Sequence, residues 1–501
     1  MKSESSAPSS ERCTTGVPGL DEILGGGLPR NRLYLVQGHP GVGKSTLALQ
    51  FLLDGVKRGE RVLYITLSET REELESVAFA HGWDISPLNL FEMVAKDEQL
   101  HTEADTTFFH PSEVELNRTT KTLLDEIERC NPSRVVFDSL SEMRMLADTP
   151  LRYRRQILQL KQFLAGKKCT VLFLDDLTSG IHDLQVESIV HGVVTLTRSS
   201  PSYGAARRQV HVQKMRGVKF SEGLHDSVVQ TGGVVVFPRL VAADHNVDFR
   251  HEAVPSGIKG LDALLGGGLD RGTSNMFMGP PGTGKSTLTL KFAHSAAQRG
   301  EKVMMFIFDE VTDTLVSRSA KLGMDIGPFV ANGLIRIQQV DPAEIAPGEL
   351  AHKIRRGVQT DDVRLVVIDS INGYMNAMPE ERHLNLQLHE LLSFLNQQGV
   401  LTIMVLAQQG LVGQMQSGVD LTYLADTVLI LRYFEAAGAV KQAISTIKKR
   451  SGSHERTIRE FRVSSHGIEV GEPLTNMHGV LTGVPIFLNS NANPLLATAG
   501  T

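Results

Sequence analysis

The most constraining feature of this 501-residue chain is an internal duplication that covers most of its length. Residues 15–28 (TGVPGLDEILGGGL) return as residues 256–269 (SGIKGLDALLGGGL). A short apolar segment follows in each copy, and then the pattern G-x-x-x-x-G-K-S, so that Lys44 and Lys285 lie 241 residues apart. Each copy is long enough to bury its own hydrophobic core, and the sequence therefore predicts two similar domains in tandem.

The repeated pattern is that of a phosphate-binding loop. Its glycines let backbone N–H groups turn toward the phosphates, its lysine reaches the β and γ oxygens, and its serine hydroxyl holds Mg²⁺. The predicted nucleotide-binding residues are Gly38, Gly41, Gly43, Lys44, Ser45 and Thr46 in the first copy, and Gly279, Gly282, Thr283, Gly284, Lys285, Ser286 and Thr287 in the second.

Apolar segments alternate with helical patterns in both copies. The matched strands are expected at 33–36 and 275–278, 61–66 and 302–307, 134–138 and 365–369, and 169–174 and 401–406. Continuous apolar strands between helices are typical of an α/β fold with a parallel-centred sheet flanked by helices. The expected domains span residues 14–245 and 250–485, with a disordered N-terminus at 1–13 and a flexible tail at 486–501.

Two aspartates end matched strands and are candidate metal-site residues. Asp138 follows the apolar run Val135–Phe137, and Asp369 occupies the same place in the second copy. Parallel α/β sheets bind ligands at the carboxyl ends of their strands, where an acidic residue reaches Mg²⁺ through water. We expect Ser45 with Asp138, and Ser286 with Asp369, to hold the metal; the alternative is an aspartate in an ordinary turn.

Hydrolysis also needs a carboxylate that orients the attacking water. The strand after the loop helix is followed by Ser68-Glu69 in the first copy and by Asp309-Glu310 in the second. Glu69, Asp309 and Glu310 are therefore candidate catalytic residues. The alternative is a solvated strand end, since acidic residues are common there.

Composition restricts the partners. The formal net charge of −5 favours neither nucleic acid nor another polyanion as a ligand. The three cysteines show no metal-ligand spacing and fit free thiols in a reducing compartment. No stretch approaches 18 consecutive apolar residues, so we expect a cytoplasmic protein that does not enter a membrane.

Together these features resemble the KaiC family, the ATPases of the cyanobacterial circadian clock, with relatives of the RecA/DnaB class. The resemblance covers residues 14–485, and it includes the segments Lys214–Gly217 (KMRG) and Lys448–Phe461 (KKRSGSHERTIREF). It implies two tandem RecA-like P-loop NTPase domains that bind ATP and Mg²⁺. It also implies a homo-hexamer with ATP at the subunit interfaces, where four cations reach the neighbour's nucleotide: Lys214, Arg216, Lys448 and Arg450. The alternative for these cations is an ordinary surface β-hairpin.

Members of this family also phosphorylate Ser and Thr residues in their own C-terminal half. Thr422 has a hydroxyl where the family has its phosphorylated Ser, whereas Tyr423 replaces the adjacent Thr. Ser417 is a second candidate in the same segment. The resemblance thus implies serine/threonine autokinase activity in the second domain, and the alternative is that Thr422 caps a turn or a helix.

Three functions remain open from the sequence. The first is a ring-forming tandem ATPase with autokinase activity that acts in signalling or timing. The second is a DNA-handling ATPase of the RecA/DnaB type, because a fold does not fix a function. The third is a nucleotide-gated scaffold with incidental turnover. In the first interpretation, the first copy is a slow hydrolase and assembly clamp, and the second is where phosphoryl transfer to protein occurs.

Overall fold

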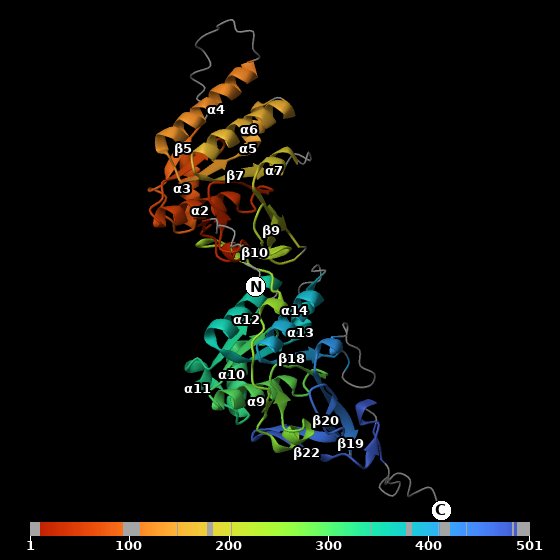
Figure 1. The fold of residues 1–501 in the computed structure, drawn as a ribbon. Helices are drawn as coiled ribbons and strands as arrows, with labels where there is room; N and C mark the ends of the chain where they lie inside the picture. The colour runs from red at the N-terminus through yellow and green to blue at the C-terminus, as the bar shows by residue number, and fades with distance from the viewer. Residues whose placement is uncertain are drawn as a thin grey trace, which may run out of the picture. The chain divides into compact units, whose positions relative to one another are not determined.

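The computed structural model describes residues 11–93, 111–147, 149–177, 184–201, 203–341, 343–376, 383–408, 410, 421–436, 438–482 and 485–487. The chain divides into two compact units, residues 1–239 and 240–501. Figure 1 shows the fold and labels several helices and strands of each unit. The division falls six residues before the expected end of the first domain at residue 245.

Residues 240–245 pack on the second unit rather than on the first. They include the short 3-10 helix η2 (Ala242–Asp244). The backbone N–H of Ala242 donates to Glu390 Oε2 at 3.0 Å, and the His245 ring lies edge-on to Phe394 with centroids 5.4 Å apart. Leu240 belongs to the core of the second unit. Contacts between segments that are distant along the chain thus place residues 240–245 in the second unit, and polar composition alone does not reveal such contacts.

The first unit is a nine-stranded, mostly parallel sheet with helices on both faces. Its strands lie in the order β11-β10-β9-β8-β3-β7-β6-β4-β5, and β8 to β11 continue the sheet as antiparallel neighbours. Its elements are β1 (Arg12–Cys13), α1 (Leu20–Ile23), β2 (Leu28–Pro29), β3 (Leu33–Gly38), α2 (Lys44–Lys57), β4 (Val62–Thr66), α3 (Arg71–Ala80), β5 (Asn89–Glu92), α4 (Pro111–Cys130), β6 (Arg134–Asp138), α5 (Leu140–Leu146), α6 (Pro150–Gly166), β7 (Thr170–Asp176), α7 (Leu184–Ile189), β8 (Gly192–Ser199), β9 (Arg207–Met215), β10 (Leu224–Gln230) and β11 (Gly233–Phe237).

The second unit repeats this topology strand for strand. Its sheet order is β16-β15-β17-β18-β14-β19-β20-β21-β22, the first order read from the other end. Its elements are β12 (Ala253–Val254), α8 (Lys259–Leu264), β13 (Leu269–Asp270), β14 (Ser274–Gly279), α9 (Lys285–Gln298), β15 (Lys302–Ile307), α10 (Thr312–Lys321), α11 (Gly327–Ala331), β16 (Ile335–Gln339), α12 (Pro347–Asp361), β17 (Val363–Asp369), α13 (Ile371–Asn376), α14 (Leu384–Gln397), β18 (Leu401–Ala407), η3 (Thr422–Leu424), β19 (Thr427–Ala436), β20 (Ala439–Lys449), β21 (Ile458–Ser464), β22 (Gly467–Pro473), β23 (Met477–His478), η4 (Val480–Thr482) and β24 (Ile486–Phe487). The predicted tandem RecA-like α/β fold is confirmed.

The pairing register corrects one match between the copies. Arg134 pairs with Thr170 in the first sheet, and Leu365 pairs with Leu401 in the second. Thr170, and not the expected Cys169, therefore corresponds to Leu401. With this register Asp176 at the end of β7 corresponds to Ala407 at the end of β18, a difference that bears directly on the phosphate-binding loops.

Side-chain alternation divides each sheet into two apolar faces. In β3, Tyr34 and Val36 join the core beneath α2 and α3, whereas Leu33 and Leu35 join the core beneath α4 and α6. Successive side chains of a strand point to opposite faces, so a buried strand needs apolar residues at every position. This explains why the strands read as continuous apolar runs. Figure 1 shows α4 and α6 together on one side of the first sheet.

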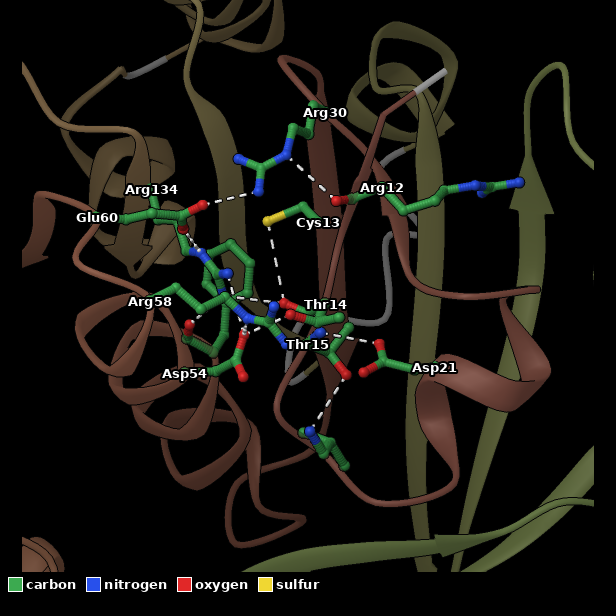
Figure 2. Close-up of polar contacts among 12 residues, drawn as sticks. Arg12, Cys13, Thr14, Thr15, Asp21, Arg30, Asp54, Arg58, Glu60 and Arg134 are labelled. Carbon is green, nitrogen blue, oxygen red and sulfur yellow. Dashed lines mark hydrogen bonds and ion pairs between the residues drawn. The ribbon is translucent and has the colours of Figure 1, made fainter. Parts of the chain in front are cut away.

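A fully buried arginine joins three segments of the first unit. Arg134, at the start of β6, donates to Asp54 Oδ2 (3.0 Å) and to the carbonyl oxygens of Thr14 (2.9 Å) and Phe51 (2.7 Å). It also forms an ion pair with Glu60. Figure 2 shows the guanidinium group between the two carboxylates. This network ties the N-terminal segment to α2 and to β6, the strand that ends at a candidate metal-site aspartate.

Two further expectations concern the thiols and the membrane. All three cysteines are free, and Cys13 and Cys169 are buried. Burial raises the pKa of the Cys169 thiol to about 11. Among the helices in the described ranges, none combines the length and the apolar character needed to cross a lipid bilayer.

Candidate functional site

Both phosphate-binding loops connect a central strand to a long helix. The first lies between β3 and α2, and the second between β14 and α9. The residue before each helix is a glycine in the left-handed region, Gly43 at φ 107° and Gly284 at φ 94°. A side chain would strain this backbone, which directs the first N–H groups of the helix toward the loop. Both loops thus have the shape that cradles phosphates.

In the first unit the candidate metal-site residues meet. Ser45 Oγ donates to Asp138 Oδ2 at 3.0 Å. The same oxygen accepts a hydrogen bond of 2.6 Å from the Tyr64 hydroxyl. Asp138 is 5% exposed, and its burial raises its pKa, although the two hydrogen bonds act in the opposite direction.

Glu69 lies beside this pair. Ser45 Oγ is 3.4 Å from Glu69 Oε1, while Glu69 Oε2 is buried and has no hydrogen-bond partner among the residues that the structure describes. Burial, followed by the nearby charge of Asp138, raises the pKa of Glu69 to about 7. An orphaned buried carboxylate oxygen is suited to hold a water molecule. The water-orienting role of Glu69 stays a prediction.

The lysine of the first loop is neutralised by a carboxylate that the sequence analysis missed. Lys44 Nζ contacts Asp176 Oδ1 at 2.5 Å and donates to the carbonyl oxygens of Gly38 (2.9 Å) and His39 (3.1 Å). Asp176 ends β7, the strand beside β3, and pairs with Gly38. The pattern that predicts Asp138, an acidic residue at the end of an apolar strand, also applies to Asp176.

The second site is a cavity of about 160 Å³. Six predicted residues line it together: Gly282, Lys285, Ser286, Asp309, Glu310 and Asp369. Lys285 Nζ donates to the carbonyl oxygen of Pro280 at 2.6 Å, and burial lowers the pKa of this lysine to about 8. Burial raises the pKa of Asp369, and a hydrogen bond from Ser286 opposes this shift.

The adjacent acids of the second site have different partners. Asp309 Oδ2 accepts a hydrogen bond of 2.7 Å from Ser370 Oγ. Arg318 donates from Nε to Glu310 Oε1 at 3.2 Å and from Nη2 to Glu310 Oε2 at 2.7 Å. Its Nη1 also donates to Thr287 Oγ1 at 3.0 Å. Arg318 lies on α10, and nothing in its sequence context predicts this contact. Both oxygens of Glu310 are therefore engaged, whereas Glu69 Oε2 has no partner among the described residues.

The four cations that are predicted to reach a neighbouring subunit donate hydrogen bonds to backbone carbonyl oxygens of their own unit. Lys214 donates to the carbonyl of Glu187, and Arg216 donates to that of Ser188 at 2.8 Å. These carbonyls belong to the C-terminal end of α7. None of these contacts involves the phosphate-binding loop of the same unit.

The matching pair in the second unit contacts the candidate phosphorylation segment. Lys448 Nζ donates to the carbonyls of Thr422 (2.9 Å) and Ala425 (2.6 Å). Arg450 donates to the carbonyl of Tyr423 at 3.2 Å. Thr422 is half-buried at the start of η3, and Ser417 lies outside the described residues.

The residues present suit Mg²⁺ bound together with a nucleotide. In the described parts of the chain, no cluster of three or more His, Cys, Asp or Glu side chains could hold a metal by itself. A P-loop site needs no such cage, because Mg²⁺ takes phosphate oxygens, one hydroxyl and a carboxylate acting through water. Ser45 with Asp138, and Ser286 with Asp369, supply those protein groups.

Comparison with known proteins covers nearly the whole chain. The model of the KaiC ATPase family matches residues 13–241 and 254–475. The circadian clock protein KaiC3 of Synechocystis sp. is 24% identical over 95% of this chain and 95% of its own length. The circadian clock oscillator protein KaiC of Thermostichus vulcanus is 25% identical over 99% of this chain and 95% of its own length. The circadian clock protein KaiC2 of Synechocystis sp. is 26% identical over 96% and 85%, respectively.

Proposed function

The chain belongs to the KaiC family of ATPases, and from this premise we propose that it binds and hydrolyses Mg²⁺·ATP in both halves as a cytoplasmic signalling or timing protein. The observation that carries this proposal is the convergence of a P-loop lysine, a serine hydroxyl and strand-ending carboxylates in each unit. The named relatives are clock proteins, and their similarity extends through both halves.

In the first site each residue has a definite task. The loop backbone and Lys44 bind the phosphates. Lys44 leaves its contact with Asp176 and donates hydrogen bonds to phosphate oxygens instead. Glu69 Oε2 orients the attacking water and accepts its proton. Mg²⁺, when bound, neutralises developing charge on the transferring phosphoryl group. Ser45 would hold that ion through its hydroxyl group, and Asp138 would hold it through water.

In the second site Asp309 and Glu310 share the corresponding position. Release of Arg318 would free Glu310 to orient water, because the guanidinium group now donates a hydrogen bond to each of its two oxygens. Asp309 is exposed and lies next to Ser370, so it already faces the cavity. This arrangement supports hydrolysis that depends on a local rearrangement at α10.

In a ring of subunits, each neighbour would supply positive charge to the nucleotide. The pairs Lys214–Arg216 and Lys448–Arg450 would leave their carbonyl partners to meet a neighbour's nucleotide and stabilise the transition state. Lys448 and Arg450 lie beside the backbone of residues 422–425, so the Thr422 segment would be near the neighbour's nucleotide when these cations reach it. This supports Thr422 as an acceptor for autophosphorylation between subunits.

Hydrolysis is tested first with single-site variants. Glu69→Gln should abolish turnover by the first site, and Glu310→Gln with Asp309→Asn should abolish turnover by the second. Phosphate release is measured with Lys44→Ala and Lys285→Ala as references that remove nucleotide binding. Unchanged turnover in the Glu69→Gln and Glu310→Gln proteins would contradict the catalytic assignment.

The ring is tested by complementation between two defective chains. Both chains carry Glu69→Gln. The first also carries Lys285→Ala, which removes nucleotide binding by its second site, and the second carries Lys448→Ala/Arg450→Ala, which removes the cations. Mixed rings should regain second-site turnover, since the first chain donates cations to the nucleotide of the second. Arg462→Ala, which alters an exposed arginine of β21 paired with Glu460, is the matched control and should stay active alone. Failure to complement would contradict cations acting in trans.

Autophosphorylation is tested by phosphopeptide mapping after incubation with Mg²⁺·ATP. We expect phosphate on Thr422 in the wild-type chain and none there in Thr422→Val. Ser417→Ala is the control within the same segment. Absence of phosphate from both residues would leave an ATPase without kinase activity.

A further inference from the structure

We propose that Tyr64 is a positioning residue that tunes the Mg²⁺ dependence of the first site alone. This rests on the proposed function, namely that the first half binds Mg²⁺·ATP. Tyr64 is in the middle of β4, is 0% exposed, and was not among the predicted site residues.

Strand register brings the tyrosine to the aspartate. Tyr64 pairs with Val136, and Thr66 pairs with Asp138, on the neighbouring strands β4 and β6. Tyr64 and Asp138 are therefore diagonal neighbours on one face of the sheet, the face covered by α2. Diagonal positions lie within reach of long aromatic side chains. The Tyr64 hydroxyl uses this reach to donate to Asp138 Oδ2 at 2.6 Å.

The two donors to Asp138 have separate consequences. Ser45 Oγ and Tyr64 Oη both donate to Oδ2, at 3.0 and 2.6 Å. Neither bond competes with a metal-bound water for Oδ1. A hydroxyl has one donor and two acceptor sites, so Ser45 keeps its bond to Asp138 while its lone pairs remain available to Mg²⁺. Tyr64 adds a second fixed point that limits rotation of the carboxylate.

The second unit provides an internal comparison. Met305 takes the position of Tyr64, because Met305 pairs with Val367 and Ile307 pairs with Asp369. A thioether donates no hydrogen bond. Met305 therefore cannot supply Asp369 with the hydrogen bond that Tyr64 donates to Asp138. Outer-shell donors of this kind orient the groups that serve a metal.

A buried tyrosine hydroxyl needs some acceptor, so the bond by itself could be purely structural. The chain contains a matched control for this alternative. Tyr34, on β3 in the same core, is also 0% exposed and donates to the carbonyl oxygen of Pro29 at 2.6 Å. Tyr34→Phe removes an equivalent hydroxyl that does not touch Asp138.

The experiment measures nucleotide binding in full-length Lys285→Ala protein, where the first site alone binds. The fluorescent analogue mant-ATP is titrated in EDTA and over a series of Mg²⁺ concentrations. Tyr64→Phe should raise the Mg²⁺ concentration for half-maximal binding by about tenfold and leave the affinity in EDTA unchanged. Tyr34→Phe should alter neither quantity.

Two outcomes would overturn the positioning role. One is an unchanged Mg²⁺ dependence in Tyr64→Phe; the other is an equal change in Tyr34→Phe. In an Asp138→Asn background, Tyr64→Phe should have no further effect, and an additive effect would also contradict the proposal. Failure of the Lys285→Ala parent to bind mant-ATP with Mg²⁺ would instead contradict the proposed function of the first half.

Discussion

At the scale of single residues, the two sites differ in how their charges are neutralised. Lys44 contacts Asp176, whereas Lys285 donates to a backbone carbonyl and burial lowers its pKa to about 8. Glu69 keeps a buried oxygen without a partner in the described parts of the chain, whereas Glu310 is paired with Arg318. Two copies with nearly identical loops thus start from different electrostatic states.

The first prediction concerns Asp176. Asp176→Ala reproduces the corresponding residue of the second unit, Ala407, and removes a carboxylate that competes with phosphate for Lys44. We expect ATP to bind the first site about threefold to fivefold more tightly, as measured by titration without Mg²⁺ in Lys285→Ala protein. The reciprocal Ala407→Asp change, in Lys44→Ala protein, should weaken the second site. Weaker binding by Asp176→Ala would mean that this carboxylate supports the nucleotide.

The second prediction concerns Arg318. Arg318→Met retains the apolar stem and frees Glu310 from both hydrogen bonds. Second-site turnover should rise about tenfold in a Glu69→Gln background, since the freed carboxylate can act as the base. The added Glu310→Gln change should remove the gain. Arg336→Ala, which breaks an exposed pair with Asp361, is the control and should leave turnover unchanged. A fall in turnover in Arg318→Met would show that the ion pair supports catalysis.

At the scale of elements, the start of β6 distinguishes the units. In the first unit the fully buried Arg134 forms an ion pair with the partly buried Asp54, and by the repeat offset and strand register Leu365 and Ser295 replace them in the second. Ser295 Oγ donates instead to the carbonyl of Ser256 at 2.7 Å. The second unit therefore lacks both the arginine and the aspartate, in agreement with the high free-energy cost of a buried charge that has lost its partner.

This gives a prediction for the coupled change. Arg134→Leu or Asp54→Ser alone should lower the free energy of unfolding of the first unit by about 3 kcal/mol. The double variant should lose less than the sum of the two, because no arginine is left buried without Asp54. Trp83, the sole tryptophan, lies in the first unit, so its fluorescence in urea follows that unit specifically. Strict additivity would contradict the pairing.

At the scale of the whole molecule, each unit has its own sheet and its own apolar cores. The first unit ends at Arg239, whose backbone N–H donates to Nδ1 of the fully buried His225 at 2.9 Å. His225 Nε2 lies 3.0 Å from the carbonyl oxygen of Ser221. The neutral ring, with its proton on Nε2, satisfies both contacts.

The free energy of unfolding of the first unit should therefore depend on pH. Burial lowers the pKa of His225, so below about pH 6.5 the unfolded chain binds a proton that the folded unit does not. Stability should therefore fall as the pH decreases through that range. His225→Gln should reduce this dependence in urea titrations followed by Trp83 fluorescence at pH 5 and 7. His478→Gln, at an exposed position of β23, is the control. An identical pH dependence in His225→Gln would contradict this origin.

Much of the fold and part of the site were predictable because they rest on local patterns. The repeat predicts two domains, apolar runs between helices predict covered parallel strands, and Asp138 and Asp369 end such strands. Residues at the carboxyl ends of adjacent parallel strands meet at one edge. The sheet order and the one-residue shift in β7 were not predictable, since strand pairing joins segments that are distant along the chain.

The sequence by itself thus determined the duplication, the α/β class, the two loops and the acids that follow the strands. Only the tertiary structure decided which partner each charged group has: Tyr64 for Asp138, Asp176 for Lys44, and Arg318 for Glu310. The physical reason is that hydrogen bonds and ion pairs depend on separations of about 3 Å, which follow from strand register and helix packing. Residue spacing along the chain carries no record of those distances.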